Sequence, residues 1–302
     1  MSDAFASETP VAKPDSEVSY APPPPPKPKP KPAPATTPKP KPKVAPQPAP
    51  PPKSKAPSPP TPPPPAPIRV DLELVMLVDV SDSVDDEEYL LQRLGYIEAF
   101  RDAELHALIA SRNGVAVNMI QWSGKYQHAG SGWFLLYDAE DCLAFADRLA
   151  RFDRRYRGGT NMGDALRVGR DAMFNNKKNG AKILGERKLI DVSGDGVCEN
   201  YYFHATGEGT YADGTPLPQN FFGHSWERRR GELVKNEVIV NAISIGNTEG
   251  LKEWYATEVP MGDYSFAMHA DTFEAFGEAI KLKLLRELAT PIPATEIGTA
   301  YD

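Results

Sequence analysis

The chain has 302 residues and a formal net charge of −7, but its prolines and charges are unevenly distributed. Residues 1–67 hold 27 of the 32 prolines and carry a net charge of +5, whereas residues 68–302 carry 25 bases and 37 acids. The second part is long enough to bury one substantial core, and its acidity argues against general binding of nucleic acid.

The proline-rich segment, residues 21–67, alternates Pro with Lys and Ala and has almost no larger apolar side chains. Because proline lacks the backbone donor, we expect residues 1–67 to be a disordered tail of polyproline II character. Such a tail acts either as a spacer or as a ligand for a partner that binds proline-rich segments. We expect one domain over residues 68–291 and a short C-terminal tail over 292–302.

Neither a membrane span nor an export signal is visible in the sequence. No apolar run approaches the ~18 residues of a membrane helix, and the N-terminus lacks the basic region and apolar core of a secretory signal. As written, the chain is expected to be cytoplasmic, and a misassigned start would leave export open. Of the two cysteines, Cys142 falls in an apolar helical pattern, and Cys198 falls in a loop where it is a candidate for exposure.

The first part of the domain alternates strand and helix patterns. Residues 72–79 form an apolar run rich in Leu and Val, which indicates a strand buried on both faces. Residues 85–110 have apolar side chains at helical spacing and four acids in the first turn, which predicts one helix. The pattern then predicts strands over 115–123 and 133–137, and a helix over 139–152.

The second part continues the alternation after a glycine-rich loop. Residues 155–161 lead into a helix that ends near 174, and 187–196 form a buried strand that ends in an acidic turn. After a polar stretch, 197–222, the pattern predicts a helix over 225–236, a strand over 238–246, a short helix over 250–257, an edge strand over 263–268 and a helix over 271–289. This order predicts an α/β fold, with a doubly wound, mostly parallel sheet covered by helices on both faces.

Three loops that carry polar side chains are expected at the carboxyl edge of this sheet, where ligands bind in such folds. Their sequences are DVSDS (79–83), GGTN (158–161) and SGDG (193–196). Together they offer two carboxylates and three hydroxyls without His or Cys, a set of hard oxygen ligands that suits Mg²⁺, or Mn²⁺ in its place, better than Zn²⁺. The candidate ligands are Asp79, Ser81, Ser83, Thr160 and Asp195.

This three-part pattern resembles the metal-ion-dependent adhesion site of von Willebrand factor A domains. The stretches VDLELVMLVDVSDSVDDEEYLLQRLGY, IQWSG, KLIDVSGDG and AIKLKLLREL also resemble a bacterial family of A-like domains without an assigned function. The resemblance implies a Rossmann-like fold over about residues 70–290. It further implies that Ser81 and Ser83 bind the ion directly, that Thr160 binds it when a ligand is present, and that Asp79 and Asp195 act mostly through water.

The function that these observations favour is a protein-binding module without enzymatic activity, in which an Asp or Glu of a partner completes the magnesium coordination. Candidate contacts of the partner are Asp82, Asn161, Tyr201 and Tyr202. Two other functions stay open: a scaffold or regulatory subunit of a larger assembly, for example one with an ATPase, and a magnesium-dependent hydrolase. The second is disfavoured because Ser81 stands where haloacid-dehalogenase-type phosphatases have a second Asp.

Three further interpretations concern single groups of residues. In one alternative, Asp79, Ser81 and Ser83 cap the following helix and are not metal ligands, since Ser and Asp are favoured N-caps. In a second alternative, Cys198, His204 and His224 bind a zinc ion. Four arginines that precede the threonine loop form either a solvated helix end or a docking patch for acidic partners or phosphate: Arg151, Arg154, Arg155 and Arg157.

Overall fold

The computed structural model describes residues 65–198 and 223–290. Its strands are β1 (Ile68–Asp79), β2 (Val115–Trp122), β3 (His128–Gly130), β4 (Phe134–Leu136), β5 (Lys177–Lys178), β6 (Ala181–Gly194), β7 (Val238–Ile245) and β8 (Ala267–Ala270). Its helices are α1 (Asp86–Ala99), α2 (Ala103–Ala110), α3 (Ala139–Ala150), α4 (Met162–Phe174), α6 (Gly223–Lys235), α7 (Leu251–Glu258) and α8 (Phe273–Ala289). Within the described ranges, none of these helices has the length and apolar character needed to span a membrane.

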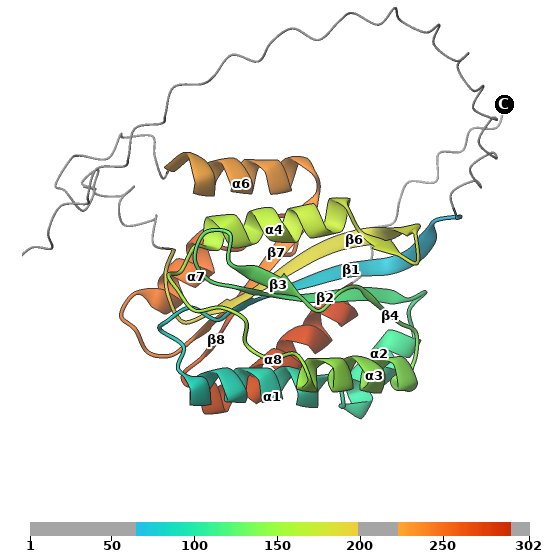
Figure 1. Cartoon of the computed structure of the whole chain (residues 1–302), viewed down its shortest axis with the longest axis horizontal. Helices are drawn as coiled ribbons and strands as arrows, with labels where there is room; N and C mark the ends of the chain where they lie inside the picture. The colour runs from blue at the N-terminus through green and yellow to red at the C-terminus, as the bar shows by residue number, and fades with distance from the viewer. Residues whose placement is uncertain (1–64, 199–222, 291–302) are drawn as a thin grey trace, which may run out of the picture. The chain divides into compact units, whose positions relative to one another are not determined.

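The strands form a doubly wound sheet in the order β3-β2-β1-β6-β7-β8 (Figure 1). Strands β2, β1, β6, β7 and β8 run parallel, whereas β3 and β4 each pair antiparallel with β2. This mostly parallel α/β architecture confirms the predicted fold class. The predicted disorder of the N-terminal tail falls almost entirely on residues outside the described part of the chain.

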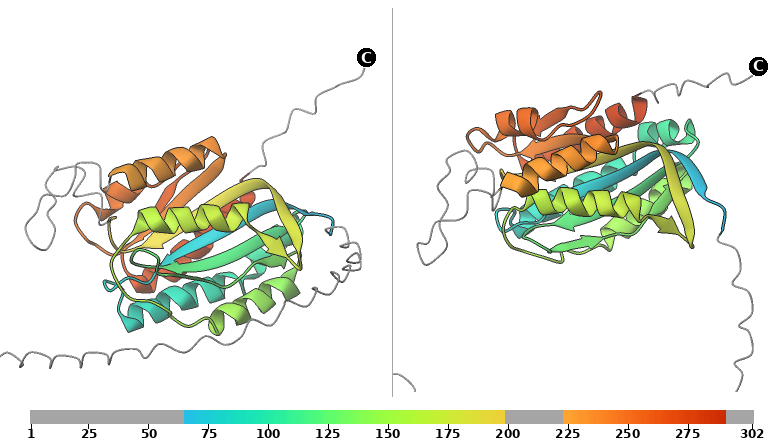
Figure 2. Two further views of the ribbon diagram at one scale, coloured as in Figure 1. Left: turned by 45° about the horizontal axis from the view of Figure 1, so that its top comes forward. Right: turned by 90° about the horizontal axis from the view of Figure 1, so that it is seen from above.

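Helices cover both faces of the sheet (Figures 1 and 2). One face packs against α1, α2, α3 and α8, with Leu74 and Met76 of β1 in a core that includes Tyr96 and Phe276. The other face packs against α4, α6 and α7, and there Val75 and Leu77 lie in a second core. Because successive side chains of a strand point to opposite faces, the apolar run of β1 supplies both cores, as the sequence predicted.

The predicted helix over 85–110 is wrong, because the structure has two helices there. Helix α1 ends at Ala99, and α2 begins at Ala103 after Asp102 caps it by accepting from the backbone N–H of Glu104 at 2.9 Å. Apolar residues on both sides of the break pack into the same core. The apolar spacing therefore continues across the break and does not reveal it, and the only local signal is Asp102, a favoured N-cap residue.

The strand boundaries also differ from those predicted. Strands β1 and β6 begin earlier than expected, at Ile68 and Ala181, because they pair with each other along ten residues of each strand. The edge strand predicted at 263–268 lies instead at 267–270, and β3 and the β5–β6 pairing carried no clear sequence signal.

The helix that follows β1 and the helix that precedes β6 lie on opposite faces of the sheet. Helix α1 follows β1 on the first face, whereas α4, which comes before β6, lies on the second. The carboxyl ends of β1 and β6 are level, since Val78 pairs with Ser193. The connections thus change face between β1 and β6. We expect a crevice between the carboxyl ends of these two strands, because ligands bind at such switch points in open α/β sheets.

Candidate metal site at the carboxyl edge of the sheet

The loop after β1 is folded tightly around the carboxylate of Asp79. This side chain is fully buried, and its Oδ1 accepts a hydrogen bond from the backbone N–H of Ser81 at 2.8 Å. Val80 and Val84 are also fully buried and hold the loop against the core. The two valines thereby leave the intervening hydroxyls at the surface end of the strand, where they face the other two loops.

The hydroxyls of the three loops form a continuous series of hydrogen bonds. Thr160 Oγ1 donates to Ser81 Oγ at 3.4 Å, and the Oγ atoms of Ser81 and Ser83 lie 3.0 Å apart. Ser83 Oγ donates to Asp195 Oδ1 at 2.7 Å. The structure therefore brings together all five residues that the sequence indicates as ligands, although they span more than a hundred positions of the chain.

The surroundings of Asp79 and Asp195 offer too little positive charge and too few hydrogen bonds to offset the burial of these carboxylates. Asp79 Oδ2 is buried and has no hydrogen-bond partner. Burial, together with the charge of Asp195, raises the pKa of Asp79 to about 8, and burial also raises the pKa of Asp195. A divalent cation would supply the missing partner for Asp79 Oδ2, and the surrounding oxygens are those that Mg²⁺ prefers. The residues present therefore fit such an ion.

The last residue of β6 lies so close to Asp79 that it must be a glycine. A Cβ atom at Gly194 would lie 2.5 Å from the hydroxyl oxygen of Tyr255 and 2.8 Å from Asp79 Oδ2. Tyr255 is fully buried, and its hydroxyl donates to the backbone oxygen of Gly196 at 3.3 Å. Helix α7 thus supports the third loop from the second face of the sheet.

A buried polar network beneath the site fixes the end of β1. Gln92 Nε2 donates to the backbone oxygen of Asp79 at 3.3 Å, and Ser193 Oγ donates to Gln92 Oε1 at 3.2 Å. Tyr96 donates its hydroxyl hydrogen to Ser193 Oγ at 3.2 Å. These residues link α1, β1 and β6 by satisfied hydrogen bonds in a water-poor interior. Sequence analysis missed them, and the only available signal was a Gln on the inward face of α1.

Arg154 holds the first loop in place, and sequence analysis assigned it otherwise. Its guanidinium donates to the backbone oxygens of Val80 at 2.9 Å, Ser81 at 2.7 Å and Asp85 at 3.3 Å. The side chain is only 9% exposed. For Arg154, both a solvated helix end and a docking patch are therefore wrong. Its positive charge also lowers the pKa of Asp79 and Asp195 against the larger effect of burial.

The helix that follows the first loop has a different cap from the one considered. Asp85 accepts from the backbone N–H of Glu88 at 2.9 Å, and Glu88 Oε2 accepts from that of Asp85 at 2.7 Å, a reciprocal capping box. The interpretation of Asp79 and the two serines as helix caps is therefore wrong.

The predicted partner contacts lie in different environments. Asp82 is exposed, and its backbone N–H donates to Gly158 O at 2.8 Å. Asn161 is half-buried and caps α4, with its Oδ1 accepting from the N–H of Asp164 at 3.0 Å. Tyr201 and Tyr202 lie outside the described residues.

The cysteine and zinc predictions have different outcomes. Cys142 is buried as predicted, and burial raises the pKa of its thiol to about 12. Cys198 is buried too, against the expectation of exposure. The other members of the alternative zinc set, His204 and the side chain of His224, lie outside the described part of the chain. Among the described residues, no three His, Cys, Asp or Glu side chains are grouped as metal ligands, and the candidate site above differs because three of its five members are hydroxyls.

Comparison with known families assigns the chain. The model of DUF1194, a protein family of unknown function, matches residues 69–208 and 212–292. The chain belongs to the DUF1194 family. This confirms the predicted relation to a family without an assigned function. No curated protein matches the sequence.

Solved structures similar to this DUF1194 protein come from diverse sources. The pilus adhesin SpaC from Lactobacillus rhamnosus GG has 18% identity and a TM-score of 0.48, over 74% of this chain and 30% of the adhesin. Proximal thread matrix protein 1 from the mussel byssus, with a zinc-occupied MIDAS motif, has 13% identity and a TM-score of 0.45, over 72% and 46%. The SpRpn10 VWA domain has 13% identity and a TM-score of 0.42, over 74% and 96%.

This chain spans less than half the length of the adhesin and of the thread protein. These similarities concern the fold alone.

Proposed function

We propose that this protein is a binding module in which Mg²⁺, or Mn²⁺, is held by Asp79, Ser81, Ser83, Thr160 and Asp195, and in which an Asp or Glu of a partner protein completes the coordination. The observation that carries the proposal is the buried oxygen of Asp79, which has no hydrogen-bond partner although it lies beside a series of hydroxyls. Bound metal would supply an electrophilic centre that attracts a carboxylate.

The chemistry of the loops favours binding over catalysis. The only acids of the five-residue set are Asp79 and Asp195, and the position two residues after Asp79 holds Ser81, which cannot act as a general acid or base as a second Asp would. A role as a subunit of a larger assembly uses the same metal site and differs only in the identity of the partner. We therefore regard it as a variant of the proposal.

Calorimetric titration of the full chain with Mg²⁺ and Mn²⁺ tests the metal site. We expect saturable binding at one site in the wild-type chain and no binding in Asp79→Asn. Asp82→Asn changes an exposed neighbouring acid and should bind as the wild type does. Equal binding by wild type and Asp79→Asn would contradict the proposed site.

A peptide-binding experiment tests the role of the partner. The immobilised chain is exposed to a library of short random peptides that share a central Glu, and to a matched library with Gln in its place. We expect retention only of the Glu library and only with Mg²⁺ present. Retention that survives chelation, or that is equal for the Gln library, would contradict a metal-bridged contact.

A further inference from the structure

An open groove runs between α1 and α8 on the first face of the sheet. It encloses about 370 Å³, and its apolar lining includes Leu91, Leu94, Ala99 and Phe273. Leu94 is 50% exposed and Leu91 is half-buried, whereas Ala99 and Phe273 are only 1% and 7% exposed. The apolar surface that the groove presents to a ligand therefore comes from Leu91 and Leu94.

The groove exists because two glycines meet where the helices cross. A Cβ atom at Gly95 of α1 would lie 3.0 Å from the Cα of Gly277 of α8 and 2.9 Å from Phe276 Cδ1. The two backbones therefore approach too closely for a side chain between them, and the larger residues stand on either side of the crossing. The lining is thus fixed by packing of the helices and is preformed.

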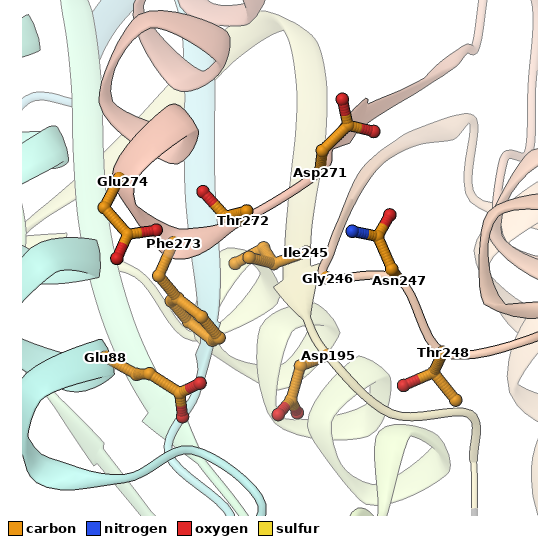
Figure 3. Close-up of a pocket in the computed structure, with 10 residues that line it drawn as sticks. All are labelled: Glu88, Asp195, Ile245, Gly246, Asn247, Thr248, Asp271, Thr272, Phe273 and Glu274. Carbon is orange, nitrogen blue, oxygen red and sulfur yellow. The ribbon is translucent and has the colours of Figure 1, made fainter.

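This groove continues into a second cavity that reaches the candidate metal site. The second cavity encloses about 340 Å³ at the carboxyl ends of β6, β7 and β8, and Figure 3 shows the side chains around it. Phe273 and Glu274 line both cavities, and Asp195 lines the second. Of the five candidate ligands, Asp195 alone lines this cavity, and it accepts from Ser83 Oγ at 2.7 Å, so the cavity meets the candidate metal site at Asp195.

The groove and the second cavity together form a path, and carboxylates dominate the charge along it. The acidic residues that line one or both cavities are Glu88, Glu98, Asp102, Asp195, Asp271, Glu274 and Glu278. Among the described residues, the one base that lines either cavity is Lys281, which pairs with Asp102 at 2.6 Å. In the described part of the chain, neither Glu274 nor Glu278 forms an ion pair. A partner that brings a carboxylate to the metal would therefore meet like charges beside it, and these oppose association.

We propose that the partner segment that carries the metal-binding carboxylate also carries basic and apolar side chains, and that it lies along this path. Its basic side chains pair with Glu274 and Glu278, and its apolar side chains pack on Leu91 and Leu94. This inference rests on the proposed function, because the carboxylate at the metal sets the position of the segment. The path then selects among acidic partners, since an acid without neighbouring bases is repelled.

The central-Glu peptide library tests the inference on the full chain with Mg²⁺. We expect the peptides retained by the wild type to be enriched at least threefold in Lys and Arg on one side of the Glu. The double variant Glu274→Gln/Glu278→Gln should lose that enrichment and yet bind Mg²⁺ with unchanged affinity. Leu94→Ser should lose the enrichment in apolar residues. The matched controls are Glu186→Gln, an exposed acid away from both cavities, and Leu282→Ser, which is 55% exposed on α8 but lines neither cavity.

The outcomes separate this inference from the proposed function. Retention that needs Mg²⁺ and Glu but shows no basic enrichment, or enrichment that persists in the double variant, overturns the path and leaves the metal-bridged contact standing. Retention that does not need Mg²⁺ overturns the proposed function itself. Dimerisation of the wild type that the double variant abolishes, measured by sedimentation, would assign the groove to a second copy of the chain and overturn the inference.

Discussion

Two groups of acids, one in the interior and one at the carboxyl edge of the sheet, differ in how their charge is balanced. Asp191 and Glu287 are fully buried, and Lys283 forms ion pairs with both, while Asn241 donates to Glu287 at 2.9 Å. Four residues further on, Asp195 approaches the fully buried Asp79, and the nearest cation, Arg154, binds backbone oxygens of the loop. Among the described residues, the protein thus supplies a lysine to the first group and no comparable cation to the second.

The difference separates a structural cluster from a binding site made with similar side chains. A buried carboxylate needs a counter-charge or hydrogen bonds, because desolvation opposes its ionised form. In the first group the ammonium of Lys283 supplies the counter-charge, although Asp191 Oδ2 and Glu287 Oε2 have no hydrogen-bond partner. In the second, Ser83 satisfies Asp195 in part and Asp79 Oδ2 has no hydrogen-bond partner, a need that the proposed ion would meet.

The largest expected effect comes from removing the lysine. Lys283→Met would leave Asp191 and Glu287 buried without their cation, so we expect the free energy of unfolding in urea to fall by about 3–5 kcal/mol. The control is Lys281→Met, on the same helix, because Lys281 pairs with Asp102 near the surface and its loss should change little. Equal destabilisation by the two variants would contradict the distinct role of the buried cluster.

Metal-dependent stabilisation should distinguish the second group. With Mg²⁺ at about 100 times its dissociation constant, the free energy of unfolding of the wild type should rise by ~2.7 kcal/mol. Asp79→Asn should show no rise, because the neutral amide does not attract the ion, whereas Asp82→Asn should respond as the wild type does. Chemical unfolding with and without the metal measures the difference. A full rise in Asp79→Asn would show that the ion binds elsewhere.

The pH dependence of the metal-free chain should reveal the unpaired charge of Asp79. Its pKa is about 8 in the folded protein and near 3.8 without the fold, so the folded state holds a proton that the unfolded state releases in this window. The Asp79 contribution to stability is therefore greatest at low pH and is lost as the pH rises from about 4 to about 8.

Asp79→Asn removes this contribution. Between pH 5 and pH 8 in chelator, the free energy of unfolding of the wild type should fall relative to that of Asp79→Asn by more than about 1.4 kcal/mol, the equivalent of one pKa unit. Parallel pH profiles of the two proteins would mean that Asp79 is already ionised and compensated in the absence of metal.

The smallest effect is expected at the arginine that holds the loop. Arg154→Lys keeps the positive charge but loses the planar fork that reaches the backbone oxygens of Val80 and Ser81 together. We expect the affinity for Mg²⁺ to fall about fivefold, the equivalent of ~1 kcal/mol for a lost hydrogen bond. Arg157→Lys, on the same loop but 50% exposed, is the control for calorimetry. A similar loss in both variants would exclude a specific role of Arg154.

The sequence by itself determined the alternation of strands and helices and the location of the metal-site loops. The apolar run that ends at Asp79 indicated a strand buried on both faces, and the side chains of β1 do divide between two cores. These features follow from local periodicity, which is written directly in neighbouring residues. The parallel sheet then brings the ends of β1 and β6 to one edge, so loops far apart in the chain could be grouped before any contact was known.

Only the tertiary structure decided which residues support that site and how its charge is balanced. Arg154 stands among other arginines and Gln92 among helical residues, and nothing adjacent in the sequence shows that each binds the backbone of a distant loop. The break between α1 and α2 is hidden in the same way, because side chains before and after it pack into one core. Hydrogen bonds and packing between residues far apart in sequence depend on the folded arrangement of several elements, and periodicity within one element does not encode them.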